Sequence, residues 1–130
     1  MMALRTVLAA VPLAVVLTFM AAGPASAGKL TEAAPQAMRD YADQAGYILA
    51  SIQLCGGDTA EEEYFRGLAR DNLVQIGADD DDLGFLDHYM AEAAGIAKPK
   101  KRECGDEGAV PVSAKLFGHR AAIEKALKAK

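Results

Sequence analysis

Residues 35–57 read PQAMRDYADQAGYILASIQLCGG, and this stretch decides the fold. Its apolar side chains recur at spacings of three and four residues, the period of one face of an α-helix. They are Met38, Tyr41, Ala42, Ala45, Ile48, Leu49 and Ile52. Pro35 suits a first helical turn, where its missing N–H costs nothing, and the Gly56–Gly57 pair is typical of a helix end. The stretch predicts an amphipathic helix from about Pro35 to Cys55, slightly weakened by Gly46 on its flank.

The same period recurs twice further along the chain. Thr59 and Glu62 have the spacing of a capping box, which predicts a second helix from Thr59 to Gly77. Its apolar face holds Phe65, Leu68, Ala69, Leu73 and Ile76. A third helix is predicted to begin within Asp79–Asp82 and to end at Gly95. Its apolar face holds Leu83, Leu86, Tyr89, Met90 and Ala93.

The two ends of the domain are less regular. Residues 28–34 are predicted to be a short, mobile lead-in, and residues 98–110, which are charged and broken by proline and glycine, to be a loop. A last helix is predicted from about Ser113, with Leu116, Phe117, Ile123 and Leu127 facing inward. Because no stretch shows convincing strand alternation, we predict an all-α fold, a small bundle of about four helices.

The first 27 residues have the three parts of a secretory signal peptide. Arg5 precedes an uncharged apolar stretch, and the chain then reads ASA at residues 25–27. Signal peptidase requires small side chains at the first and third positions before the cut, so we expect cleavage after Ala27, before Gly28. The apolar run is long enough to span a bilayer, so an uncleaved anchor is the alternative. Pro12 and the A-x-A ending argue against that anchor.

We therefore predict a cleaved signal peptide over residues 1–27 and one domain over residues 28–130, periplasmic or secreted. Cys55 and Cys104 are the only cysteines, and in an oxidising compartment such a pair usually forms a disulfide. Closing the 48 residues between them would stabilise the fold by roughly 4 kcal/mol. The alternative is a redox-active or metal-binding thiol pair, but redox motifs usually place the cysteines two residues apart.

Charge is unevenly distributed along the chain, whose formal net charge is −4. Residues 28–97 hold 4 basic and 14 acidic side chains, whereas residues 98–130 hold 9 basic and 4 acidic ones. The simplest interpretation is that a basic final segment packs against an acidic body. We expect no nucleic-acid partner for an exported acidic protein, and no stable membrane insertion after cleavage.

Four adjacent carboxylates are weak candidates for a cation site, since oxygen ligands bind hard cations such as Ca²⁺. They belong to Asp79, Asp80, Asp81 and Asp82. An EF-hand loop needs acidic groups at alternating positions and a glutamate at the twelfth, where this chain has methionine. We favour a helix cap followed by an acidic first turn, and we predict no metal and no cofactor.

A basic cluster near Pro99 is a possible partner-contact patch for anionic lipid, peptidoglycan or an acidic protein, although a solvated loop is the favoured interpretation. The cluster consists of Lys98, Lys100, Lys101 and Arg102. Three aromatic residues, Tyr47, Tyr64 and Phe85, lie off the main apolar stripes. They indicate a second buried face or, as the alternative, a partner-binding patch.

Catalytic patterns are missing from the sequence. His88 and His119 have no metal-ligand spacing, and Ser51 and Ser113 do not lie in a G-x-S-x-G turn. We therefore predict that the protein is not an enzyme. In size, helicity and compartment it resembles small exported helical proteins such as acid-stress periplasmic chaperones and periplasmic immunity proteins, but it matches no motif of theirs, so the resemblance implies no function.

The leading hypothesis is an interaction protein of the cell envelope: a binder, inhibitor, accessory subunit or chaperone whose partner is another envelope protein. The second is a carrier of a small ligand or divalent cation, held by the acidic turn or in a cavity lined by Met38, Met90 and aromatic residues. The third is a small envelope enzyme that uses convergent carboxylates.

Overall fold

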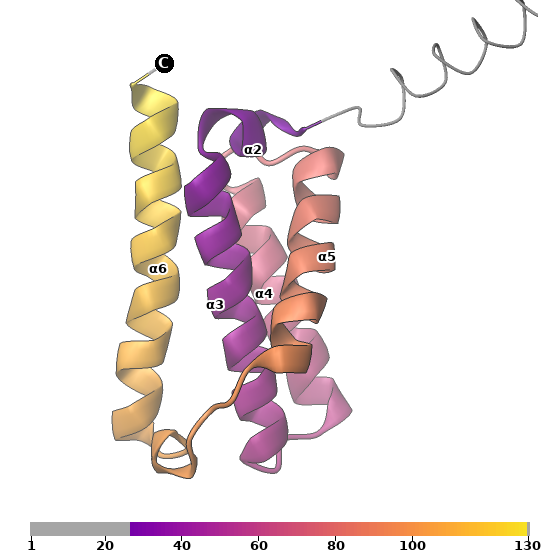
Figure 1. Ribbon diagram of the computed structural model, residues 1–130, viewed down its shortest axis with the longest axis vertical. Helices are drawn as coiled ribbons and strands as arrows, with labels where there is room; N and C mark the ends of the chain where they lie inside the picture. The colour runs from indigo at the N-terminus through magenta and orange to yellow at the C-terminus, as the bar shows by residue number, and fades with distance from the viewer. Residues whose placement is uncertain (1–26, 130) are drawn as a thin grey trace, which may run out of the picture.

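The computed structural model describes residues 27–129, so residues 1–26 of the predicted signal peptide lie outside the described part (Figure 1). The described chain forms five α-helices and one 3-10 turn and has no strand, which confirms the all-α prediction. In chain order these are α2 (Lys29–Ala33), α3 (Pro35–Leu54), α4 (Thr59–Val74), α5 (Asp80–Ile96), the 3-10 turn η1 (Lys101–Glu103) and α6 (Asp106–Lys128).

Helix α3 is the centre of the bundle. Figure 1 shows α6 and α5 on either side of it and α4 behind, with the short α2 across one end. Side chains from α3 fill the core, and Leu73, Leu86, Met90, Leu116 and Ile123 meet them from the other helices. The hydroxyl of the buried Tyr41 donates to the carbonyl of Ala69 at 2.7 Å, which ties α3 to α4. Burial raises the pKa of Tyr41 to about 12.

Gly46 has a different role from the one predicted. It is buried where α3 meets α5, and a Cβ there would lie 2.5 Å from the Cβ of Ala93 and 2.6 Å from the carbonyl oxygen of Met90. The missing side chain therefore allows the two helices to approach closely. What looked like a weak point on the flank of α3 is a required point of helix packing.

One predicted helix cap and one predicted helix start are wrong. The N-cap of α4 is Asp58, whose carboxylate accepts from the Glu61 N–H at 2.9 Å, and Thr59 is the first helical residue. Helix α6 begins at Asp106 and includes Pro111, so much of the predicted loop is helical. Acidic side chains in the first turn of α6 favour its start, and Pro111 removes only one backbone donor near that end.

The longer α6 also explains a wrong side-chain assignment. Leu116 and Ile123 face the core as predicted, but Phe117 is 53% exposed. Adjacent residues on a helix point about 100° apart, so a helix that buries Leu116 turns Phe117 toward its flank.

The predicted mobile lead-in is wrong as well. Residues 29–33 form α2, in which Leu30 is completely buried, and Ala34 is also part of the core. Among the described residues, no helix combines the length and apolar character needed to cross a bilayer.

Candidate functional site

The predicted disulfide is present and lies at one end of the bundle. Cys55 caps the C-terminus of α3, Cys104 follows η1, and their Cα atoms are 5.4 Å apart. The bond joins two segments 49 positions apart in the sequence. It therefore fixes the start of α6 against the end of α3, and it indicates an oxidising compartment.

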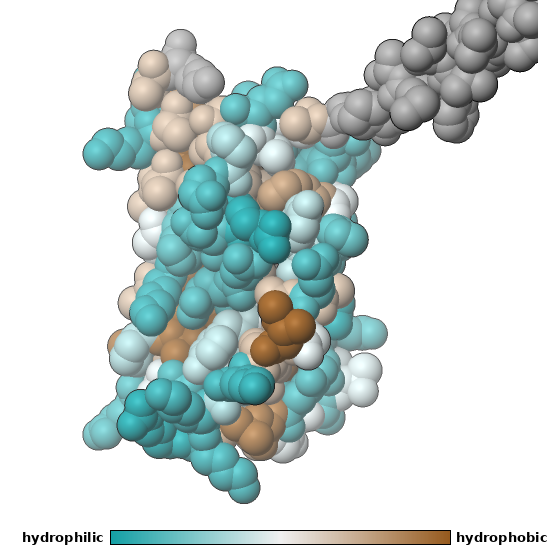
Figure 2. All heavy atoms as spheres, in the orientation of Figure 1, coloured by the Kyte–Doolittle hydropathy of each residue, from teal (hydrophilic) through white to brown (hydrophobic). Residues whose placement is uncertain are grey.

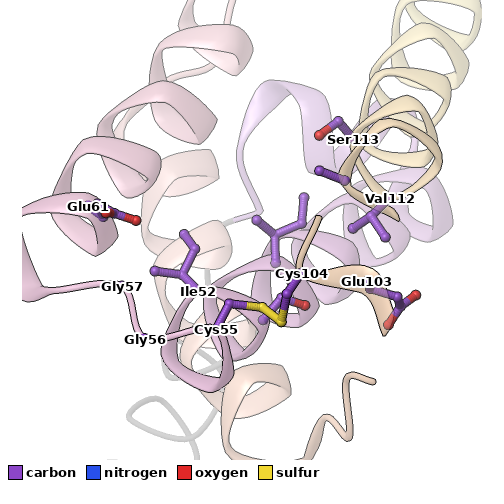
Figure 3. Close-up of a pocket in the computed structure, with 12 residues that line it drawn as sticks. Ile52, Cys55, Gly56, Gly57, Glu61, Glu103, Cys104, Val112 and Ser113 are labelled. Atoms are coloured by element: carbon purple, nitrogen blue, oxygen red, sulfur yellow. A yellow bond between two sulfur atoms is a disulfide. The ribbon is translucent and has the colours of Figure 1, made fainter. Parts of the chain in front are cut away.

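A hollow of about 330 Å³ opens beside the disulfide (Figure 3). Ile48 and Ile52 of α3 line it between Glu61 on α4 and Val112 and Ser113 on α6. Figure 3 shows Ile52 above the sulfur atoms, with Glu61 on one side and Val112 on the other. The hollow is thus lined by all three of these helices.

Two shallower hollows continue it along the flanking helices. The one along α4 shares Ile52 and Glu61 with the central hollow, and the one along α6 shares Ala109 and Ser113 with it. Both add exposed apolar side chains, namely Tyr64 (73% exposed) and Leu68 (39%) on α4, and Val110 (68%) and Phe117 (53%) on α6. We call this continuous surface, from Tyr64 and Leu68 across Ile48 and Ile52 to Val110 and Phe117, the α4–α6 groove.

Arg120 joins α4 and α6 further along the bundle, beyond Phe117. Its guanidinium donates to the carbonyl of Asn72 at 3.0 Å and to the side-chain oxygen of Gln75 at 3.3 Å. Both acceptors are neutral oxygens. Arg120 belongs to the basic final segment, and it therefore contacts the acidic body through carbonyl oxygens rather than through carboxylates. The contact limits the groove to the half of the bundle next to the disulfide.

The predicted basic patch lies beside the disulfide, on and before η1, and its four side chains are exposed. Glu103 lies among them and accepts from the backbone N–H of Lys100 at 3.0 Å and from the hydroxyl of Tyr47. The bond from Tyr47 is the main cause of the lowered pKa of Glu103. The same bond raises the pKa of Tyr47. The patch therefore contains one ionised carboxylate in a fixed position.

The three off-stripe aromatic residues have different positions. Phe85 is half-buried against the core and packs against Tyr89, with the ring centroids 4.6 Å apart and the rings tilted by 55°. Tyr47 is also half-buried, whereas Tyr64 is exposed in the groove. Figure 2 shows the face with α3, α5 and α6 toward the viewer, where hydrophilic side chains separate small apolar patches.

The four adjacent aspartates form the other notable site, at the opposite end of the bundle. Asp79 is the N-cap of α5 and forms a capping box with Asp82, so the predicted cap is present. Asp80 and Asp81 are exposed, but Asp82 is completely buried. Among residues 27–129, no three His, Cys, Asp or Glu side chains come together as a metal-binding group.

The carboxylates of Asp79 and Asp82 also cap α2. Asp79 accepts from the N–H of Lys29 at 3.0 Å, and Asp82 accepts from the N–H groups of Leu30 at 3.0 Å and Thr31 at 2.9 Å. The hydroxyl of Thr31 donates to Asp82 at 2.8 Å. These bonds satisfy N–H groups that a helix leaves free at its start, and the backbone donors lower the pKa of Asp79. We call this assembly, Gly28–Thr31 with Asp79 and Asp82, the N-terminal anchor.

The other candidate residues have different positions. His88 lies apart from both sites, exposed and 3.5 Å from the carboxylate of Glu92. Ser51 lines the central hollow, where its hydroxyl donates to the backbone carbonyl of Tyr47 at 3.0 Å. Met38 and Met90 are fully buried in the core and do not line the groove. No histidine lines the central hollow, where Glu61 and Glu103 are the acidic residues.

Sequence reasoning missed both the groove and the anchor. A weak signal for the groove existed, because Tyr64 lies off the predicted stripe of α4 and Val110 lies in a predicted loop. Comparison with protein-family models, curated proteins and solved structures found no match to this chain.

Proposed function

We propose that this protein is an exported binding module, processed before Gly28 in the periplasm or outside the cell. In this proposal it holds an apolar helical segment of another envelope protein in the α4–α6 groove. The observation that carries the proposal is the band of exposed apolar side chains along the groove, described above. Scattered apolar residues are normal on a surface, whereas a contiguous band next to an open hollow is typical of an interaction site.

The shape of the groove favours a helix as the occupant. Successive helices of the bundle run in opposite directions (Figure 1). The alternate helices α4 and α6 therefore run in the same direction, antiparallel to α3. Two such helices resting on a third leave a furrow that an amphipathic helix can fill, with anchors at every third or fourth residue.

Negative charge along the α4 edge of the groove indicates which kind of partner segment would bind there. Asp58, the N-cap of α4, and Glu61, in its first turn, are exposed and line the part of the groove along α4. A bound helix that places Lys or Arg beside this edge would gain favourable ion pairs and faster association. The proposed partner segment is therefore apolar on one face and basic along the edge that meets α4.

Position-specific photo-crosslinking in the native envelope tests the groove. A photoreactive amino acid replaces Leu68 or Phe117 in the groove, and, as matched controls, Val74 on the outer side of α4 or Ile96 at the end of α5. Val74 is 50% exposed and Ile96 is 77% exposed, so both controls are at least as accessible as Leu68. We expect one common adduct from the groove positions, whose cross-linked peptide has the amphipathic, basic character described above.

A binding measurement with that peptide completes the test. Leu68→Asp and Phe117→Asp should each weaken its affinity about tenfold or more, as expected when a charge replaces a large apolar side chain that the bound helix covers. Val74→Asp should leave the affinity unchanged. Equal adducts at groove and control positions, or equal affinities of the variants, would refute the groove as the binding surface.

A small apolar ligand is the second candidate, because the volume of about 330 Å³ beside the disulfide falls in the usual range for small-molecule sites. Native mass spectrometry of protein taken from the envelope separates the two candidates. Extra mass of a few hundred daltons that denaturation removes would favour the ligand, whereas a protein-sized addition would favour the partner helix.

The same spectrum tests export and processing. A chain that begins at Gly28, lighter by two hydrogens for the disulfide, is expected. A chain that retains residues 1–27 would instead support the alternative in which the apolar segment stays uncleaved and holds the protein in the membrane.

A further inference from the structure

We infer that removal of the signal peptide places a new positive charge in the N-terminal anchor, where it stabilises the folded bundle. This inference rests on the proposed processing before Gly28. Hydrolysis of the Ala27–Gly28 peptide bond consumes one water and leaves a carboxylate on Ala27 and an ammonium group on Gly28. The uncleaved chain has a neutral amide at the same nitrogen, so cleavage changes the charge at this one point.

Gly28 lies directly against the two anchoring carboxylates. It is buried, and a Cβ built on it would lie 2.1 Å from Oδ1 of Asp82 and 2.4 Å from Oδ1 of Asp79. The nitrogen and such a Cβ share the same Cα and are about 2.5 Å apart. The Gly28 nitrogen is therefore within about 4.6 Å of the Asp82 oxygen and about 4.9 Å of the Asp79 oxygen.

The residues that follow fix Gly28 in this position. Its carbonyl accepts from the N–H of Glu32 at 2.9 Å, which begins the hydrogen bonding of α2. Asp79 and Asp82 hold the next three N–H groups of that helix, and Leu30 is buried in the core. Backbone hydrogen bonds at each of residues 28–32 thus hold the new terminus next to the two carboxylates.

The two carboxylates differ in their remaining capacity. Asp82 already accepts four hydrogen bonds, from Leu30, from Asp79 and two from Thr31, which occupies the roughly four acceptor sites of a carboxylate. Asp79 accepts from Lys29 and from Asp82, so it has free acceptor sites. The ammonium group therefore pairs with Asp79 and gains from the charge of the buried Asp82.

The other charged groups around the anchor are exposed to solvent. They are Lys29 and Glu32 on α2, Asp80 and Asp81 on α5, and Lys125 and Lys128 in the last turn of α6. On α3, Arg39 is paired with Asp43 at 3.1 Å, and Asp40 accepts from Gln36 at 2.8 Å. The acidic groups nearest to Gly28 thus outnumber the cations, and opposite charge within about 4–6 Å favours the protonated amine.

The direction of the pH effect follows from this arrangement. An ordinary terminal amine has a pKa of about 7.7–8.0. If the pKa of the Gly28 amine is raised in the folded state, the charge pairing adds stability that is fully present below a pH of about 7.7. That stability is lost as the pH rises through the pKa of the amine in the folded state.

The test compares the exported protein that begins at Gly28 with a variant that carries one additional glycine before Gly28. The extra residue keeps the total charge and moves the ammonium about 3.8 Å along the chain. NMR titration of glycine labelled with ¹³C reports the amine pKa of each. We expect a pKa about one unit above the ordinary range for Gly28, an ordinary value for the variant, and a lower thermal midpoint for the variant at pH 7.

Asp79→Asn supplies the second arm, since asparagine keeps the cap of α5 and removes the charge. It should return the amine pKa toward the ordinary range, whereas Asp80→Asn should change it less. An ordinary pKa at Gly28, or equal values in the Asp79 and Asp80 variants, would overturn the inference. A native N-terminus other than Gly28 would instead overturn the proposed processing, which the intact mass shows independently of the titration.

Discussion

The two ends of this bundle are held by different means. At the N-terminal anchor, a buried carboxylate and its neighbour satisfy the free N–H groups of two helices. At the disulfide end, a covalent bond does the fixing, and apolar side chains of α4 and α6 remain exposed beside a hollow. The comparison indicates that hydrogen bonds and burial hold the N-terminal anchor in place. At the other end, the disulfide holds the helices in place while apolar side chains remain exposed.

Removing the disulfide should have the largest effect on stability. Reduction, or Cys55→Ser with Cys104→Ser, restores the freedom of the unfolded chain between the two positions and should lower the free energy of unfolding by roughly 4 kcal/mol. Urea denaturation with and without reductant measures this loss. Backbone amides at the start of α6 should lose protection first, because Cys104 fixes that segment. A loss below about 1 kcal/mol would mean that α6 is held mainly by its packing.

Removing the buried carboxylate of the N-terminal anchor should have the second-largest effect on stability. Asp82→Ala leaves the N–H groups of Leu30 and Thr31 without their acceptor and should lower the free energy of unfolding by about 3 kcal/mol. Asp81→Ala is the matched control, because Asp81 is an exposed neighbour on the same turn, and it should cost under about 0.5 kcal/mol. Similar losses in both variants would show that only the overall charge of the turn matters.

Adding a methyl group at Gly28 should have a smaller effect. The new Cβ would overlap the carboxylates of Asp79 and Asp82, so Gly28→Ala should cost about 1–3 kcal/mol in thermal or urea unfolding. Gly84→Ala is the control, since nothing lies within 4 Å of a Cβ there and alanine favours a helix. If Gly28→Ala unfolded like the native chain, Gly28 would not be held against the carboxylates.

The acid limb of the stability curve should show the smallest effect. Because its hydrogen bonds lower the pKa of Asp79 in the folded state, this residue contributes stability that is present above its ordinary pKa of 3.8. That contribution is lost as the pH falls through the lowered folded-state value. Unfolding midpoints between about pH 2 and 6 should therefore fall less steeply for Asp79→Asn than for the native chain. Parallel curves would contradict this assignment.

The helices around the core were predictable because their signals are local. The three- and four-residue spacing places α3 and α5 correctly, and the cysteine pair together with the predicted export indicated the disulfide. The anchor was not predictable, since Asp82 meets Leu30 and Thr31 across about fifty residues of chain. Without that contact, Gly28–Ala34 has too little apolar character to indicate an ordered segment.

The groove was missed for a related reason. Pro111 and two nearby glycines are typical of a loop, and packing against η1 and the disulfide overrides that preference. Once α6 starts at Asp106, Val110 and Phe117 share a flank and become part of a surface. That flank could not be recognised while the segment was assigned to a loop.

Amide hydrogen exchange of the chain that begins at Gly28, free and bound to the cross-linked partner segment, tests the difference between the two ends most directly. In the free protein, the amides of Leu30 and Thr31 should already be strongly protected, and binding should leave them unchanged. Binding should slow exchange in α3 around Ile52 and in the first turns of α4 and α6. Rapid exchange at Leu30 and Thr31 in the free protein, or new protection at the anchor rather than along the groove, would contradict the roles assigned to the two ends.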